Sequence, residues 1–293
     1  MTSTLVRRHL PHPSISRAAD PHARARDWAE IQERMLVPLY EAVYARLDIG
    51  AGTRLLGLGC GSGLALLMAA ARGAAVCGVD RDERRLDLAH ERLTPPGAPP
   101  RGDTAHPAPR LGLGGPESAC VREAGPEAGA GFTVVTAFEP LPTPGTGPAV
   151  ASAAATLAAA GALTERGGAV VLVGWGPPER CATSAVLRVG ARLADSMCAP
   201  ARWRPCGRDD LEELAERAGL RPDGSGRVAC PFGYADMDSA VRGLLSTGLF
   251  DAAERATDPT QVAKEIAEAV HPHQRADGTV WMPNVFRYLI ARA

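Results

Sequence analysis

The sequence predicts an α/β fold in which a mostly parallel sheet lies between two layers of helices. Short apolar runs typical of strands occupy residues 54–58 and 75–79, and a glycine turn and a helix-forming segment separate them. Two strands joined through a helix over so short a stretch imply a right-handed parallel crossover. Apolar runs at residues 132–138 and 169–175 continue this alternation later in the chain.

The remaining elements follow from hydrophobic periodicity and from the residues that start and stop helices. Asp27 is the expected N-cap of the first helix, and Pro38 is expected to kink that helix or split it in two. Helices are expected at residues 27–47, 64–72, 82–93, 150–163, 181–193, 209–218, 237–245 and 259–270, and further strands at 110–113, 227–232 and 285–291.

Composition limits the classes of function. The chain has 293 residues, 45% of them hydrophobic, and a formal net charge of −1, so it lacks the basic surface that nucleic-acid binding needs. No apolar run approaches the roughly 20 residues of a membrane span, and no apolar signal segment opens the chain. The 7 cysteines form no C-x-x-C pair, which argues against a zinc site and fits buried thiols in the cytoplasm.

A glycine-rich turn carries the chemistry. Residues 55–63 read Leu-Leu-Gly-Leu-Gly-Cys-Gly-Ser-Gly, and Asp80 closes the next strand. Glycine lets a backbone approach a ligand closely, and a carboxylate at a strand end can accept hydrogen bonds from both hydroxyls of a ribose. The G-x-G-x-G spacing differs from the G-x-G-x-x-G of dinucleotide sites, so a nicotinamide oxidoreductase is disfavoured. The competing interpretation is a tight strand-to-helix connection without a ligand.

This turn and Asp80 resemble motif I, and the acidic position after it, of the class I, Rossmann-like S-adenosylmethionine-dependent methyltransferases. The chain is similar to their small-molecule branch, which includes the ubiquinone-biosynthesis methyltransferases. Residues 28–33, 167–168, 173–176 and 277–288 add weaker similarities. The resemblance implies a final antiparallel strand, S-adenosylmethionine as cofactor, and methyl transfer to a small-molecule acceptor.

The chain is expected to consist of a tail and one domain. Polar composition and breaks at Pro11, Pro13 and Pro21 predict a mobile tail over residues 1–26. The resemblance implies a single methyltransferase domain over 27–293. In that domain residues 27–176 would be the cofactor-binding half, and 177–293 would supply acceptor-side helices and the final strands. The expected cofactor-binding residues are Trp28, Gly57, Gly59, Cys60, Gly61, Ser62, Gly63, Asp80, Arg81, Glu117 and Phe138.

Some of these assignments have structural rivals. Glu117 lies in the best candidate for the family's adenine-contacting segment, and Trp28 would either close over the cofactor or anchor the first helix. A general base is needed only for a hydroxyl or an acidic C–H acceptor. Glu139, His271 and His273 are candidates for that role. Glu139 is equally typical of a solvated loop, and for His271 and His273 a solvated loop is the favoured interpretation. The catalytic residues, the acceptor and the oligomeric state stay unassigned, and no metal site is expected.

One departure from the family leaves a second function open. Family members usually carry Asp or Glu where this chain has Gly57, and that carboxylate organises polar groups near the amino end of the cofactor. The segment after the third strand also departs from the family pattern. The alternative is therefore a degenerate methyltransferase fold that serves as a non-catalytic binding or regulatory module.

Overall fold

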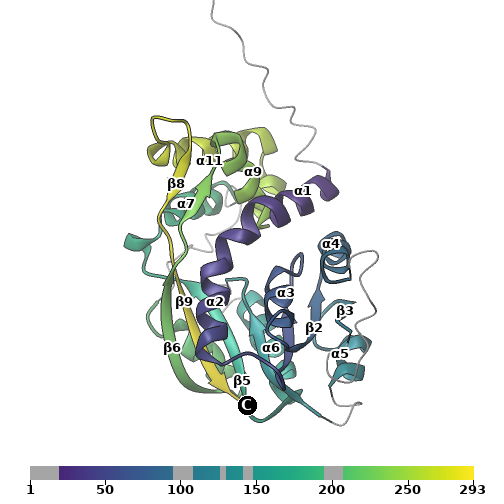
Figure 1. Cartoon of the computed structure of the whole chain (residues 1–293). Coiled ribbons are helices and arrows are strands. Elements are labelled where there is room, and N and C mark those ends of the chain that lie inside the picture. Colours follow the sequence, from purple (N-terminus) through teal and green to yellow (C-terminus); the bar gives the residue numbers. More distant parts are fainter. Residues whose placement is uncertain (1–19, 95–107, 126–129, 141–147, 195–206) are drawn as a thin grey trace, which may run out of the picture.

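A computed structural model describes residues 20–94, 108–125, 130–140, 148–194 and 207–293, and it contains one large sheet (Figure 1). The sheet has the strand order β3-β2-β1-β4-β5-β9-β6, and β9 alone runs in the direction opposite to the other six strands. Its strands are β1 (Arg54–Leu58), β2 (Ala75–Asp80), β3 (Arg110–Leu113), β4 (Phe132–Ala137), β5 (Thr164–Trp175), β6 (Arg221–Ala229) and β9 (Val285–Arg292). The expected mostly parallel sheet with an antiparallel final strand is confirmed.

Both faces of this sheet are buried, which explains why its inner strands read as continuous apolar runs. Successive side chains of a strand point to opposite faces. Leu55 and Val171 therefore enter one hydrophobic core, whereas their neighbours Leu56 and Leu172 enter the other. The sheet separates two cores that the two helical layers complete.

The helices divide between these two faces. One layer holds α2 (Val37–Arg46), α3 (Leu64–Ala70) and α4 (Glu83–Leu93); the other holds α5 (Ala119–Ala124), α6 (Pro148–Ala162) and α8 (Asp210–Arg217). Val43, Leu66 and Leu86 from the first layer join the core that contains Leu55. Leu157 and Leu211 from the second layer join the opposite core. The three-layer arrangement is thus the predicted one.

A further group of elements, which we call the cap, lies beyond the carboxyl ends of the parallel strands (Figure 1). It consists of α1 (Pro21–Asp27), α7 (Thr183–Ala194), α9 (Met237–Ser246), α10 (Asp251–Ala256), α11 (Pro259–Val270), η5 (Pro178–Arg180), η6 (His271–His273), and the paired strands β7 (Phe232–Tyr234) and β8 (Val280–Met282). Arg24 of α1 pairs with Asp251 of α10 and so ties the first helix into this group. The cap covers the end of the sheet where a ligand site is expected.

The N-terminal boundary differs from the prediction. Residues 20–26, assigned to the tail, instead begin α1, with Asp20 rather than Asp27 as the N-cap and Ala23 and Ala25 buried. Pro21 is one of the prolines that predicted a tail, but proline is favoured in the first turn of a helix. Residues 1–19 of the tail lie outside the described residues.

The first helix is also split, as Pro38 predicted. One π-helical turn, η2 (Trp28–Gln32), and one 3-10 turn, η3 (Glu33–Leu36), join α1 to α2, which has Pro38 in its first turn. Irregular turns of this kind inside a helix are frequent at functional sites. This segment faces the glycine turn.

Two further differences concern the C-terminal strands. The strand predicted at residues 227–232 is two strands, because β6 ends at Ala229 and β7 begins at Phe232. Exposed and half-buried residues alternate along β6, since it is the edge strand of the sheet. Because its first residues are polar, the hydrophobic pattern did not predict where β6 begins. The strand β8 and the helices α5 and α10 were not predicted.

The buried centre of β5 should dominate the stability of the fold. Leu172 is fully buried, so Leu172→Ala is expected to lower the free energy of unfolding by about 2–5 kcal/mol through lost contacts and a residual cavity. Urea denaturation measures this change. Leu113→Ala is the matched control, because Leu113 is 56% exposed and its loss should cost no more than about 0.5 kcal/mol. Equal effects at both positions would contradict the two-core packing.

Candidate functional site

The glycine turn lies where the order of the strands creates a crevice. The first strand, β1, has β2 on one side and β4 on the other. The strands that follow β1 in the sequence therefore lie on both sides of it, and the strand order reverses at this point. In open α/β sheets, ligands bind at such switch points beyond the carboxyl ends of the strands. The turn from Gly59 to Gly63 joins β1 to α3 at this point.

Three glycines of the turn have backbone conformations that favour glycine, with φ of 60° at Gly59, 57° at Gly61 and 78° at Gly63. At Gly61 there is also no space for a side chain. A Cβ on Gly61 would lie 2.7 Å from Nε1 of Trp28 and 2.9 Å from Oε1 of Glu33. The irregular segment η2–η3 therefore packs directly onto the backbone of the turn.

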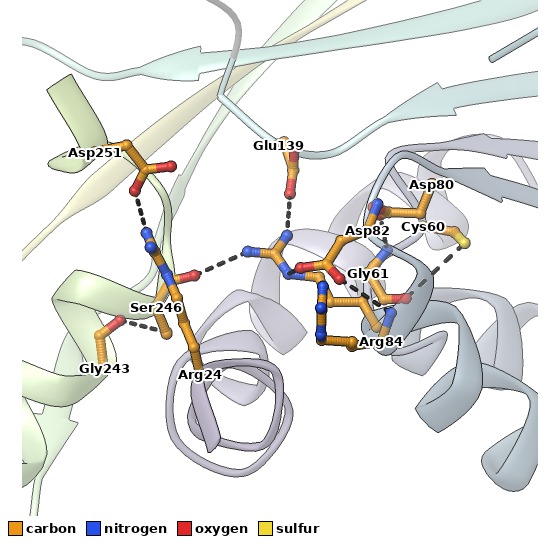
Figure 2. A network of polar contacts seen from close by, with 11 residues as sticks. Arg24, Cys60, Gly61, Asp80, Asp82, Arg84, Glu139, Gly243, Ser246 and Asp251 are labelled. Atoms are coloured by element: carbon orange, nitrogen blue, oxygen red, sulfur yellow. Dashed lines mark hydrogen bonds and ion pairs between the residues drawn. The ribbon is translucent and has the colours of Figure 1, made fainter. Parts of the chain in front are cut away.

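Asp80 ends β2 and holds the turn through its carboxylate. One of its oxygens accepts a hydrogen bond from the N–H of Gly61 at 2.8 Å, and the other accepts one from the N–H of Asp82 at 2.9 Å. Figure 2 shows the Asp80 carboxylate beside Gly61. Only 5% of Asp80 is exposed, yet it lines an open cleft. Each carboxylate oxygen has two lone pairs, so Asp80 keeps acceptor capacity for a ligand.

Three hollows meet around this turn. The outer cleft encloses about 1030 Å³, open space included, between Asp80, Arg81, residues 114–116 and α6. The inner pocket lies under the turn beside Gly57, Cys60 and Phe138. The apolar cavity, about 520 Å³ with its mouth included, reaches into the cap.

Glu139 lines all three hollows and is their common boundary. It follows β4, and its Oε1 accepts a hydrogen bond from the guanidinium of Arg85 at 2.8 Å, while a Cβ on Gly59 would lie 3.3 Å from its Oε2. Burial raises the pKa of Glu139, and the nearby carboxylates of Asp80 and Glu33 add to this effect while Arg85 opposes it. A carboxyl group with a raised pKa at a cleft is suited to accepting a proton.

Arg85 links the sheet to the cap. Besides the ion pair with Glu139, it donates a hydrogen bond of 2.8 Å to the carbonyl of Ser246 at the end of α9. Figure 2 shows Glu139 and Ser246 approaching from different parts of the chain. The guanidinium also lies over the ring of Trp28, 4.3 Å from its centroid. One cation thus joins α4, the loop after β4, the cap and η2.

A second buried charge, which the sequence analysis missed, lies on the other side of the turn. Glu33 is 1% exposed, and its carboxylate pairs with Arg92 at 2.7 Å and accepts a hydrogen bond from the hydroxyl of Ser62. It lines the inner pocket together with Gly57. Nothing in the local pattern identified Glu33, because the residues that surround it come from distant parts of the sequence.

The expected cofactor-binding residues do not all line a hollow. Trp28, Gly57, Gly59, Cys60, Phe138, Asp80 and Arg81 do so. The backbone of Gly61 and the buried side chain of Ser62 hold the turn, and Gly63 packs against Ala89. Glu117 does not line the outer cleft, but it accepts a hydrogen bond of 3.1 Å from the N–H of Gly115, which does.

The three catalytic candidates separate in the structure. Glu139 lies at the centre of the site, whereas His271 and His273 form η6 after α11 and line none of the three hollows. Among the residues that the structure describes, no group of three or more His, Cys, Asp or Glu side chains is placed to hold a metal ion. Within those same ranges, no helix is long and apolar enough to cross a bilayer.

Comparison with known proteins shows the fold. No family model and no curated protein matches this chain. The YcgJ protein of Bacillus subtilis is similar in structure, with a TM-score of 0.50 and 14% identity over 87% of this chain and 98% of that one. The cyclopropane synthase MmaA2 of Mycobacterium tuberculosis gives 0.50 and 13% over 87% and 84%. A methyltransferase of Geobacter sulfurreducens in complex with S-adenosylhomocysteine gives 0.45 and 17% over 89% and 92%.

The two likenesses with a TM-score of 0.50 and the strand order agree with the predicted fold. The chain has the fold of the class I S-adenosylmethionine-dependent methyltransferases.

The ion pair of Glu33 with Arg92 should be a strong local constraint. Arg92→Met leaves a buried carboxylate without its partner and is expected to lower the free energy of unfolding by roughly 2–4 kcal/mol. Adding Glu33→Gln should restore part of that loss, since the uncompensated charge disappears. A double-mutant cycle in urea measures the coupling. Additive losses from the two single variants would show that the pair contributes nothing.

The raised pKa of Glu139 predicts a pH dependence of stability. A carboxyl whose folded pKa lies above its unfolded value contributes stability below the unfolded pKa, and that contribution is lost as pH rises through the folded pKa. The stability of the native chain relative to Glu139→Gln should therefore fall as pH rises through the raised pKa of Glu139. Urea denaturation at a series of pH values measures the difference. A difference that does not change with pH would contradict the raised pKa of Glu139.

Proposed function

We propose that this chain binds S-adenosylmethionine and transfers its methyl group to a small-molecule acceptor. The observation that carries this proposal is the junction at Glu139, where the outer cleft, the inner pocket and the apolar cavity meet. A cofactor lying along the first two would present its methyl group toward the third. The acceptor would occupy the apolar cavity.

The residues around the turn fit each part of the cofactor. The carboxylate of Asp80 would accept hydrogen bonds from the ribose hydroxyls, and residues 114–116 would pack on the adenine. Gly59 lines both the inner pocket and the outer cleft, and a side chain there would extend toward Glu139 into space that the cofactor would need. When bound, the cofactor supplies a methyl group that its positive sulfur already activates.

The protein's own part in the reaction is to position groups and to exclude water. The aromatic rings of Trp28 and Phe138, both buried, would shield the methionine end from solvent. Nε1 of Trp28 has no hydrogen-bond partner among the described residues, so it is available to a polar atom of the ligand. Carboxylates at Glu33 and Glu139 would favour the cationic cofactor over its neutral product.

Glu33 also brings to the inner pocket the carboxylate that position 57 lacks. A Cβ on Gly57 would meet the side chain of Leu66 at 3.0 Å, whereas Glu33 brings a carboxylate to the same pocket from η3. An acidic group near the amino end of the cofactor is therefore retained in this site. This arrangement supports an active enzyme over a degenerate module.

Calorimetric titration of the purified chain with S-adenosylmethionine and S-adenosylhomocysteine tests the proposal. The native chain should bind both, and Asp80→Asn should weaken binding by at least about tenfold, because hydrogen bonds from the ribose hydroxyls to an ionised acceptor are lost. Asp87→Asn, an exposed change on α4, should leave the affinity unaltered.

The titration also separates the competing functions. A folded native chain that binds neither compound would refute the enzyme assignment and favour the non-catalytic module. Binding of NADH in the same assay would instead support a nicotinamide enzyme.

A further inference from the structure

The apolar cavity has a wall of aromatic rings. Trp175 at the end of β5 packs on Phe286 of β9 with ring centroids 4.6 Å apart, and Phe232 of β7 lies 6.1 Å from Phe286. All three residues line the cavity, and Leu36 and Leu244 also contribute to it. Flat apolar ligands gain both area burial and ring packing on such a wall.

Few polar atoms face this space, and one of them lacks a partner. Thr183 begins α7 and lines the cavity, and its residue is 1% exposed. Its backbone N–H donates to Asn284, but its hydroxyl has no hydrogen-bond partner among the described residues. Gln32 also lines the cavity, yet its amide oxygen already accepts a hydrogen bond from Tyr234 at 2.9 Å. Since a buried hydroxyl without a partner is costly, Thr183 points to a ligand that can hydrogen-bond.

The charges among the described lining residues of the cavity disfavour an anionic ligand. Its described lining residues include no Lys, Arg or His, and Glu139 is the ionisable side chain among them. A carboxylate or phosphate on the ligand would enter an apolar space beside a second negative charge, at a large cost in desolvation. The cavity therefore fits an uncharged molecule.

We propose that the acceptor is an uncharged aromatic compound with a hydroxyl group, methylated on oxygen; this rests on the proposed function. Its ring would pack on the wall formed by Trp175, Phe232 and Phe286, and Thr183 would hydrogen-bond a polar atom of the ligand.

The step balances without any further reactant. The hydroxyl oxygen bonds to the methyl carbon as the bond from that carbon to sulfur breaks. The electron pair of the broken carbon–sulfur bond stays on sulfur. The hydroxyl proton passes to Oε2 of Glu139, because Oε1 already accepts the hydrogen bond from Arg85. The products are a methyl ether, neutral S-adenosylhomocysteine and a protonated Glu139.

Four probes of similar size test this assignment on the full chain, with and without saturating S-adenosylhomocysteine. They are 2-naphthol, the anionic 2-naphthoate, the non-planar 2-decalol, and naphthalene, which lacks a hydroxyl. Calorimetry should show that 2-naphthol binds at least about tenfold more tightly than 2-naphthoate, because the anion has no cationic partner. Binding of 2-decalol should also be weaker, because its ring is not flat.

The Thr183→Val variant tests the polar contact while it conserves volume. It should bind 2-naphthol about fivefold to tenfold more weakly and bind naphthalene as the native chain does. Thr260→Val, at the exposed start of α11, is the control and should change neither affinity. With S-adenosylmethionine, mass spectrometry should detect 2-methoxynaphthalene, and Glu139→Gln should lower its rate of formation most at the pH where Glu139 is ionised in the native chain.

The outcomes separate the two proposals. If S-adenosylhomocysteine binds and 2-naphthoate competes equally with 2-naphthol, the acceptor assignment is wrong and the proposed function stands. Loss of naphthalene affinity in Thr183→Val equal to that of 2-naphthol would likewise overturn the contact with the hydroxyl. If 2-naphthol binds but neither form of the cofactor does, the proposed function fails, and the acceptor assignment fails with it.

Discussion

The lack of space around Gly61 is the constraint on which the site depends. Trp28 and Glu33 approach its backbone so closely that any side chain there would displace them, and Gly61 also has positive φ. The turn and the segment η2–η3 must therefore pack as one unit. This contact places Trp28 between the inner pocket and the apolar cavity. A regular α-helix that continued from α1 would point the side chain of Trp28 in another direction, so the irregular turn η2 is part of the site.

Charge is balanced locally around the turn. Arg92 balances Glu33, Arg85 balances Glu139, and backbone N–H groups satisfy Asp80. Each carboxylate is thus held in place before any ligand arrives, which lowers the reorganisation that binding requires. Since Arg85 also contacts the end of α9, the electrostatics of the cofactor side and the position of the cap are coupled through one guanidinium.

Local patterns in the sequence predicted the strands that are buried on both faces, the glycine turn and Asp80, because each depends on neighbours along the chain. They did not predict the first part of β6, residues 221–226, which is polar and is held by its pairing with β9, or β8, which is only three residues long. Glu33 was not predicted for the same reason as the start of β6, because its partners are distant in the sequence. Its role follows from Arg92 and Ser62, which tertiary structure brings to it. Local patterns thus predicted the turn around which the hollows lie, but not the buried charges beside it.

Under the proposed function, the glycine at position 57 is a departure from the motif that a distant residue offsets. The proposed cofactor site needs a carboxylate in the inner pocket, and that need does not determine which element provides it. Here Leu66 occupies the space into which a side chain at position 57 would extend, and Glu33 enters from the opposite wall. A carboxylate on β1 as well would bring a second negative charge close to Glu33, with Arg92 as the one cation that pairs with Glu33 in the described structure. Like charges so close together in a buried site destabilise each other, so the glycine is consistent with the glutamate rather than a sign of decay.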